Sequence, residues 1–146
     1  MTKSLEEKYG AKGKKGRDGE LFFKKFYERK GYILYDKNDN VFAQVSGVDF
    51  IIKTPDEAYT VDVKCNVKYP SEIAVEINNN GWLFNPKKIS TFISHVSPEN
   101  GMLLTYRRSR MQKFIEDNYW DARGDVIFVP ISELTFAKVE ITDKER

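Results

Sequence analysis

The stretch that decides the fold is GVDFIIKTPDEAYTVDVKC, residues 47–65. Its two halves, 48–53 and 59–65, are rich in Val, Ile, Phe, Tyr and Thr, which are the residue types favoured in β-strands. Between them, residues 54–57 (TPDE) carry the Pro and Asp of a tight turn. The sequence therefore predicts an antiparallel β-hairpin.

Three charged side chains of this hairpin, Asp49, Asp62 and Lys64, are predicted to lie close together. With the turn centred in the TPDE segment, paired residue numbers sum to 111, so Asp49 lies opposite Asp62 and Lys64 shares the face of Asp62. Two facing carboxylates are costly in a folded interior unless a proton or a cation neutralises them. Mg²⁺ and Mn²⁺ prefer oxygen ligands, which these carboxylates and the Val63 carbonyl would supply. Lys64 is placed to assist an attacking water or to hold a phosphate oxygen. The same alternation is also typical of an exposed strand without chemistry.

Asp49, followed after an apolar run by Asp62-Val63-Lys64, resembles the active-site signature of the PD-(D/E)xK nuclease superfamily. The order of expected elements resembles that of Holliday junction resolvase-like endonucleases. The resemblance implies a restriction-endonuclease-like α/β fold, with a mixed central β-sheet flanked by helices. Two positions depart from the pattern: Val48 precedes the first acid where the family has Pro, and Asp62 stands where Glu is commoner.

The resemblance also implies an activity. It implies a Mg²⁺-dependent endodeoxyribonuclease that hydrolyses phosphodiester bonds, with Mn²⁺ substituting for Mg²⁺ and branched or junction DNA as the substrate. The implied catalytic residues are Asp49, Asp62, Lys64 and Glu20, and the implied metal ligands are Asp49, Asp62, Val63 and Glu20. Cutting both strands of a junction needs two active sites, which favours a homodimer. Three alternatives remain: a non-catalytic nuclease-fold module that binds DNA or protein, an enzyme acting on RNA or single strands, and a β-rich interaction protein.

A helix is predicted for residues 18–30, where Asp18 can cap the start and Gly31 follows the end. Glu20 shares a helix face with Phe23 and Tyr27. Packing of that face on the sheet would direct Glu20 toward the hairpin acids. A glutamate in a first turn also simply favours the helix dipole.

A second helix is predicted for residues 109–119, with Ser109 and Gln112 as a capping box. Further strands are predicted for residues 32–35, 41–45, 72–77, 91–96, 102–106, 126–131 and 136–141. If the strand at 72–77 pairs with the Asp62 strand, Glu76 becomes an additional acid of the site.

Basic residues cluster in two regions. Residues 1–17 are rich in Lys and Gly and predict a flexible basic N-terminal arm ahead of a single nuclease-like domain, residues 18–146. The predicted nucleic-acid contacts are Lys14, Lys15, Arg17, Lys68, Arg107, Arg108 and Arg110. Each cation that neutralises a phosphate releases a counterion. These side chains could equally be solvated charges.

Length and composition restrict the number of domains and the kinds of site that the chain can form. The chain has 146 residues, enough for one domain, and its net charge of +2 does not by itself indicate a nucleic-acid binder. Cys65 is the single cysteine and His95 the single histidine, which excludes an internal disulfide, a Cys-rich zinc site and a multi-histidine metal site. We expect structural roles for His95 and for Trp82. The absence of a long apolar run and of a signal-peptide pattern predicts a cytoplasmic protein without a membrane contact.

Overall fold

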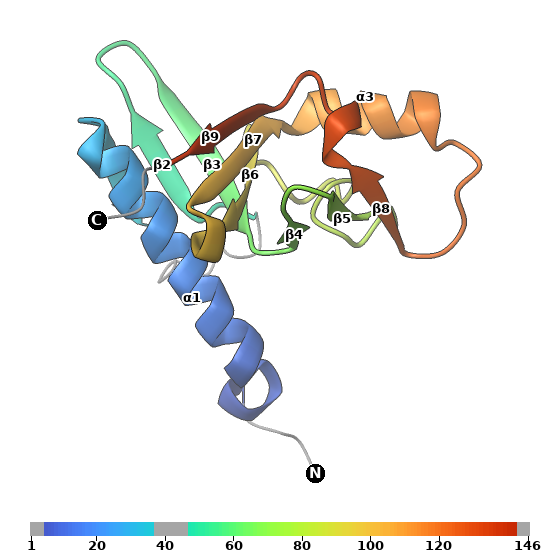
Figure 1. The fold of residues 1–146 in the computed structure, drawn as a ribbon, viewed down its shortest axis with the longest axis horizontal. Helices are drawn as coiled ribbons and strands as arrows, with labels where there is room; N and C mark the ends of the chain where they lie inside the picture. The colour runs from blue at the N-terminus through green and yellow to red at the C-terminus, as the bar shows by residue number, and fades with distance from the viewer. Residues whose placement is uncertain (1–4, 37–46, 143–146) are drawn as a thin grey trace.

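The computed structural model describes residues 5–36 and 47–142 and the side chains from Lys14 onward. A six-stranded mixed sheet of order β1-β2-β3-β6-β7-β9 forms its centre, and a three-stranded sheet of order β4-β5-β8 lies beside it (Figure 1). The bounds are α1 Leu5–Arg29, β1 Ile33–Asp36, β2 Phe50–Lys53, β3 Ala58–Lys64, β4 Val67–Lys68, β5 Glu72–Glu76, β6 Phe92–Ser97, β7 Met102–Arg107, α3 Arg108–Asn118, β8 Val126–Pro130 and β9 Lys138–Ile141. The predicted α/β fold with a mixed central sheet and helices is confirmed. The predicted strand at 41–45 lies outside the described residues.

The β2–β3 hairpin has the predicted register. Phe50 pairs with Val61 and Ile51 with Thr60, so the paired numbers sum to 111. Strand β3 also pairs with β6 in parallel. The hairpin is therefore interior to the sheet, with β1 on one side and β6 on the other. This central position fixes the strands that carry Asp49 and Asp62.

Each face of the central sheet has its own hydrophobic core, because side chains alternate along the strands. On one face, Phe23 and Phe26 of α1 pack with Phe50, Val61 and other strand residues. On the opposite face, Ile93 and Leu104 belong to a second core that includes Ile73 of β5, Met111 of α3 and Val129 of β8. Asp62 follows Val61 and therefore points away from α1, toward the second core.

Helix α1 begins earlier than the sequence predicts. It starts at Leu5, so residues 5–17 belong to the helix, although their Lys and Gly content suggested an arm ahead of a helix beginning at Asp18. The Cys65 thiol donates to the Lys15 carbonyl over 3.4 Å. This contact joins the helix, at Lys15, to the residue that follows β3.

The capping box predicted for the second helix is also wrong. Arg107 is the N-cap of α3, and no side chain caps the first turn. Gln112 instead donates from Nε2 to the Leu83 carbonyl over 2.7 Å. Gln112 therefore contacts a segment distant in sequence and does not form the predicted local capping box with Ser109. No helix of the described ranges is long and apolar enough to cross a membrane.

Two glycines of α1 offer a test of how closely this helix packs. A Cβ at Gly19 would overlap Cys65 Sγ and lie 2.9 Å from Val96 Cγ2, whereas a Cβ at Gly16 would meet nothing within 4 Å. We expect Gly19→Ala to lower the free energy of unfolding by about 1–3 kcal/mol through overpacking. The matched Gly16→Ala variant should gain up to about 1 kcal/mol from helix propensity.

Urea denaturation followed by circular dichroism measures both variants. Equal effects of the two substitutions would contradict the close approach of α1 to the end of β3.

Candidate active site

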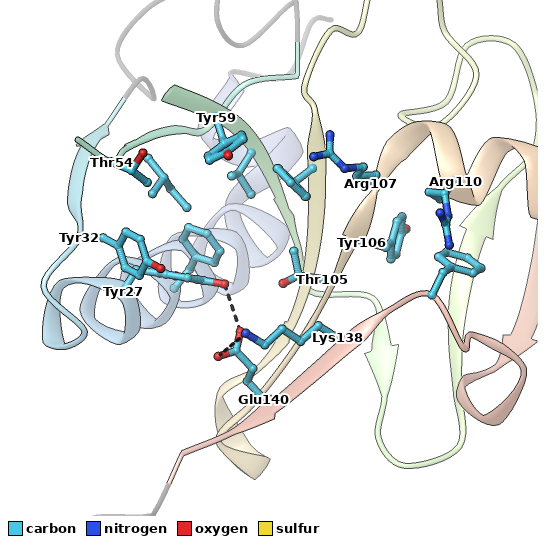
Figure 2. Close-up of a pocket in the computed structure, with 15 residues that line it drawn as sticks. Tyr27, Tyr32, Thr54, Tyr59, Thr105, Tyr106, Arg107, Arg110, Lys138 and Glu140 are labelled. Atoms are coloured by element: carbon cyan, nitrogen blue, oxygen red, sulfur yellow. Dashed lines mark hydrogen bonds and ion pairs between the residues drawn. The ribbon is translucent and has the colours of Figure 1, made fainter. Parts of the chain in front are cut away.

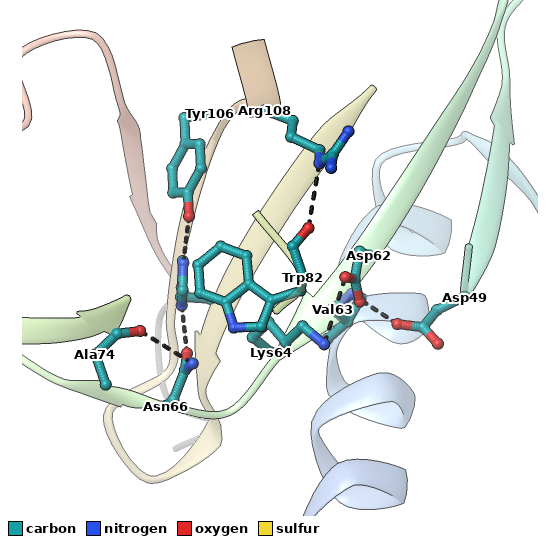
Figure 3. A network of polar contacts seen from close by, with 10 residues as sticks. Asp49, Asp62, Val63, Lys64, Asn66, Ala74, Trp82, Tyr106 and Arg108 are labelled. Atoms are coloured by element: carbon teal, nitrogen blue, oxygen red, sulfur yellow. Dashed lines mark hydrogen bonds and ion pairs between the residues drawn. The ribbon is translucent and has the colours of Figure 1, made fainter. Parts of the chain in front are cut away.

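Asp49, Asp62 and Lys64 meet on one face of the β2–β3 hairpin (Figure 3). The Asp49 N–H donates to the Val61 carbonyl over 2.9 Å, and Val61 also pairs with Phe50, so the pairing is offset by one residue at Asp49. The Val63 N–H donates to Asp49 Oδ2 over 2.7 Å and fixes that carboxylate beside β3. Lys64 Nζ lies 3.4 Å from Asp62 Oδ2. The structure therefore brings together the three residues on which the sequence prediction depends.

The Asp62 carboxyl is an unfavourable place for a negative charge. Only 3% of the residue is exposed. Its pKa is raised to about 7, first by burial and then by the charge and hydrogen bonding of Asp49, while the charge of Lys64 opposes the shift. A carboxyl with this pKa is partly protonated near neutral pH. Burial and the neighbouring Asp49 therefore favour neutralisation of this carboxyl by a proton or by a cation additional to Lys64.

Glu20 lies on α1 near the end of β3, next to Gly19, which contacts Cys65. Burial raises the pKa of the Cys65 thiol, the charge of Lys15 lowers it, and the charges of Glu20 and Asp49 raise it, so both acids lie within electrostatic range of Cys65. Among the described side chains, no three His, Cys, Asp or Glu residues form a group that could hold a metal ion. Glu20 therefore does not complete a three-acid ligand set with the hairpin acids.

The segment after β5 folds over the site and is held by Arg108. The guanidinium donates to three carbonyls: Nη1 to Lys88 over 2.7 Å, Nη2 to Asn85 over 2.8 Å and Nε to Trp82 over 3.1 Å. These bonds give Arg108, predicted as a nucleic-acid contact, a structural role. Burial lowers its pKa, and the Asp62 charge opposes this shift.

Lys88 is a residue of the site that the sequence prediction missed. A Cβ at Gly47 would lie 3.0 Å from Lys88 Cδ and 3.6 Å from Asp62 Oδ2, so the Lys88 chain and the Asp62 carboxylate flank the same glycine. Gly47 has a φ of 72°, a conformation that favours glycine. The Lys87-Lys88 pair is a basic signal in the sequence. Lys88 is far from Gly47 and Asp62 along the chain, so the sequence did not predict that they lie together.

A buried polar network supports the site from behind (Figure 3). His95 lies between Asn66 Oδ1, 2.5 Å from Nδ1, and the Tyr106 hydroxyl, 2.7 Å from Nε2. An amide oxygen only accepts, so Nδ1 carries the proton and Tyr106 donates to Nε2. Burial, with a smaller contribution from the Lys64 charge, lowers the pKa of His95 to about 3, so the ring is neutral. A buried, neutral ring with these two contacts fits the expected structural role.

Trp82 joins this network to Lys64. Its ring meets the His95 ring edge-on at 5.5 Å between centroids, and Lys64 Nζ lies 5.9 Å from the Trp82 ring centroid. Trp82 is buried, as expected of a core residue. The aromatic surface behind Lys64 limits where its ammonium group can move.

Glu76 does not belong to the site. Its strand, β5, pairs with β4 and β8 in the three-stranded sheet and makes no ladder with β3. The condition under which Glu76 would be an additional acid is therefore not met.

The predicted nucleic-acid contacts fall into two groups. Lys15 and Lys68 both line two small adjacent cavities of 180 and 220 Å³ that also share Cys65, the residue after Lys64. Lys14 and Arg17 are exposed on the same part of α1. The second group, Arg107 and Arg110, lines a separate cavity. Arg107 pairs with Phe92, which pairs with Val61, so Arg107 lies on the face opposite Asp62.

Comparison with known proteins supports the fold. No protein-family model matches the sequence, and no curated protein matches it either. Among solved structures, the chain is similar to a bacterial homing endonuclease, I-Ssp6803I, with a TM-score of 0.50 and 11% sequence identity over 90% of this chain and 78% of that one. At this identity the likeness concerns the fold alone. The chain has a nuclease-like α/β fold.

Proposed function

We propose that the protein is a metal-dependent endonuclease that hydrolyses phosphodiester bonds in DNA. One observation carries this function: two carboxylates and a lysine, from adjacent strands of a nuclease-like sheet, share one site in which Asp62 is 3% exposed. A buried carboxylate pair without enough cationic charge is what a divalent cation would relieve. Perturbed acids of this kind are concentrated at functional sites.

The donor set fits Mg²⁺, and Mn²⁺ would substitute for it. Asp49 and Asp62 would hold the ion, with the Val63 carbonyl oxygen as a third donor and Glu20 acting through water. A bound divalent cation supplies a Lewis acid and a more acidic water at such a site. The Val63 N–H holds the Asp49 carboxylate in place over 2.7 Å, so this ligand is oriented before an ion arrives.

Lys64 would stabilise the negative charge that develops on the phosphate and orient the attacking water. Its ammonium group lies 3.4 Å from Asp62 and its side chain is only 29% exposed, so it acts in a partly desolvated setting. Lys88, on the other side of Gly47, would add a second cation for the phosphate. Lys64 lies between Asp62 and the Trp82 ring, and the backbone carbonyl of Lys88 is bound by Arg108.

DNA would approach along the end of β3. Lys14, Lys15, Arg17 and Lys68 would contact phosphates there, since Lys15 and Lys68 line the same cavities beside Cys65. Branched or junction DNA is the proposed substrate, and a homodimer would supply two active sites for its two strands. Arg107 lies on the opposite face of the sheet from Asp62, and Arg110 lines the same cavity as Arg107. Neither arginine is therefore assigned to this path.

Manganese binding tests the metal site without a need for activity. We expect electron paramagnetic resonance to detect Mn²⁺ binding at pH 8, and Asp49→Asn to weaken it at least about tenfold because one ligand charge is removed. The pKa of Asp62 is about 7, so a proton competes with the ion and affinity should fall as pH drops below that value. Asp117→Asn, at an exposed residue of α3, is the matched control.

Equal Mn²⁺ affinity of wild type and Asp49→Asn would contradict the metal site. A panel of four-way junction, linear duplex, single-stranded DNA and RNA then tests the substrate. Preferential cutting of the junction supports the proposed substrate, whereas binding without cutting in either metal identifies a non-catalytic module.

A further inference from the structure

A cavity of 590 Å³ lies on the α1 side of the central sheet, away from Asp62 and Lys64 (Figure 2). Its volume is typical of ligand sites, which span about 300–1,000 Å³. Helix α1 covers only part of this sheet face, and the cavity occupies the part next to Tyr27. Its lining residues are Phe23, Tyr27, Tyr32, Ile52, Thr54, Tyr59, Val61, Phe92, Thr105, Tyr106, Arg107, Arg110, Phe136, Lys138 and Glu140.

Aromatic rings and one guanidinium form a row across this cavity. The Tyr59 and Phe92 rings meet edge-on at 5.4 Å between centroids. The Arg107 guanidinium lies 4.9 Å from the Phe92 centroid. Strand pairing holds the row in place, since Val61 pairs with Phe92 and Phe92 with Arg107. Such rings, interleaved with a guanidinium, are surfaces on which flat bases stack.

The charge of the cavity favours an anion. Arg107, Arg110 and Lys138 supply positive charge, and Glu140 is the one acid among the described lining residues. Glu140 is already neutralised: Lys30 forms an ion pair with it, Lys138 Nζ lies 3.8 Å away, and the Tyr27 hydroxyl donates to it over 3.3 Å. Figure 2 shows Glu140 at the end of the cavity away from Tyr59 and Arg107. The arginine end is left as the anion-binding end.

We propose that this cavity binds unpaired nucleotides of a nucleic-acid strand. Bases stack on Tyr59 and Phe92, and the phosphates contact Arg107 and Arg110. Duplex DNA does not fit this chemistry, because paired bases are stacked on one another and do not present free faces. The site is separate from the proposed cleavage centre, lies on the other face of the sheet, and does not depend on metal.

Binding of a fluorescently labelled oligo(dT) in EDTA, measured by anisotropy, tests this inference. We expect wild type to bind it, and to bind a duplex of the same length more weakly. Arg107→Gln combined with Arg110→Gln should weaken binding at least about tenfold. The slope of log affinity against log salt should become shallower by about 0.7 for each phosphate that the variant no longer neutralises.

Controls separate this site from general electrostatics and from misfolding. Lys113→Gln removes one exposed cation from the same helix as Arg110 and should leave binding within about twofold of wild type. Tyr59→Leu keeps an apolar strand residue and should weaken binding about fivefold, because a stacking surface is removed, while the salt slope stays unchanged.

Three results would overturn the inference. One is equal oligo(dT) affinity of the double arginine variant and wild type. Another is competition by free dTMP as strong as that by the oligonucleotide, which would identify a mononucleotide site. The last is a concentration-dependent dimer that the arginine substitutions dissociate, which would assign the cavity to a second copy of this chain.

Discussion

Asp62→Asn is expected to abolish cleavage and, at the same time, to make the folded protein more stable above pH 7. The first effect follows from the removal of one ligand charge at the proposed metal site, and we expect a fall of about 10³-fold in cleavage rate. The second follows from burial. An amide at this position has no charge to desolvate, whereas the wild-type carboxylate is 3% exposed.

The gain in stability of Asp62→Asn over wild type should increase with pH. Folding raises the pKa of Asp62 from 3.8 to about 7, so below about pH 3 the group is mostly protonated in both states and has little effect. As pH rises from about 4 to 7, the unfolded chain ionises first and is favoured. The cost to the fold is fully present above pH 7 and is on the order of a few kcal/mol. The variant should therefore gain most at pH 8 and little at pH 4.

Urea denaturation in EDTA at pH 4, 6 and 8 measures this difference. Asp117→Asn, an exposed carboxylate paired with Lys113, should change stability by less than about 0.5 kcal/mol at every pH. Adding Mg²⁺ should stabilise wild type and not Asp62→Asn, because only the wild type retains the full ligand set. A variant that is destabilised equally at all three pH values would show that Asp62 is not a strained, functional acid.

Lys64→Met is expected to abolish cleavage by a different route, with metal binding retained. Methionine keeps an unbranched apolar chain beside Trp82 but removes the ammonium group 3.4 Å from Asp62. We expect cleavage to fall about 10²–10³-fold because the developing charge is no longer stabilised. Affinity for Mn²⁺ at pH 8 should stay within a few-fold of wild type, because both carboxylates remain.

The same substitution should move the pH profile of any residual activity. Lys64 is the charge that lowers the pKa of Asp62 toward its usual range, so its removal leaves that pKa higher still. The acid limb of the profile should therefore shift to higher pH. Cleavage rates between pH 6 and 9, with Lys113→Met as an exposed-lysine control, measure the shift. Loss of Mn²⁺ binding together with cleavage would show that Lys64 maintains the site and has no separate chemical role.

The hairpin could be predicted from sequence because its signals are local. A turn at residues 54–57 between two β-rich runs fixes the register from Phe50 to Lys53, and this register brings Asp49 close to Asp62 although the Asp49 N–H bonds to Val61. The sequence also predicted a helix over residues 18–30 and the strands from β5 to β9, although the alternation at 136–141 is weak. These features place the central residues of the site without knowledge of any other contact.

The remainder of the site depends on contacts between distant segments. Arg108 holds the chain from Trp82 to Lys88 through three backbone carbonyls. Every residue has a backbone carbonyl, so the sequence does not indicate which ones accept these bonds. That connection brings Lys88 beside Gly47. In the same way, residues 5–17 belong to α1 and Lys15 contacts Cys65, whereas local composition favoured an arm. Propensity is a weak guide where tertiary packing decides.

Cleavage of supercoiled plasmid DNA tests the proposed metal-dependent centre most directly. Wild type and Lys64→Ala are incubated with Mg²⁺, with Mn²⁺ and with EDTA, and nicked and linear products are quantified. We predict cutting by wild type in either metal, none in EDTA, and a fall of at least about 10²-fold in the variant. Cutting that persists in EDTA, or that Lys64→Ala retains at the wild-type rate, would contradict a metal-dependent centre built on Asp49, Asp62 and Lys64.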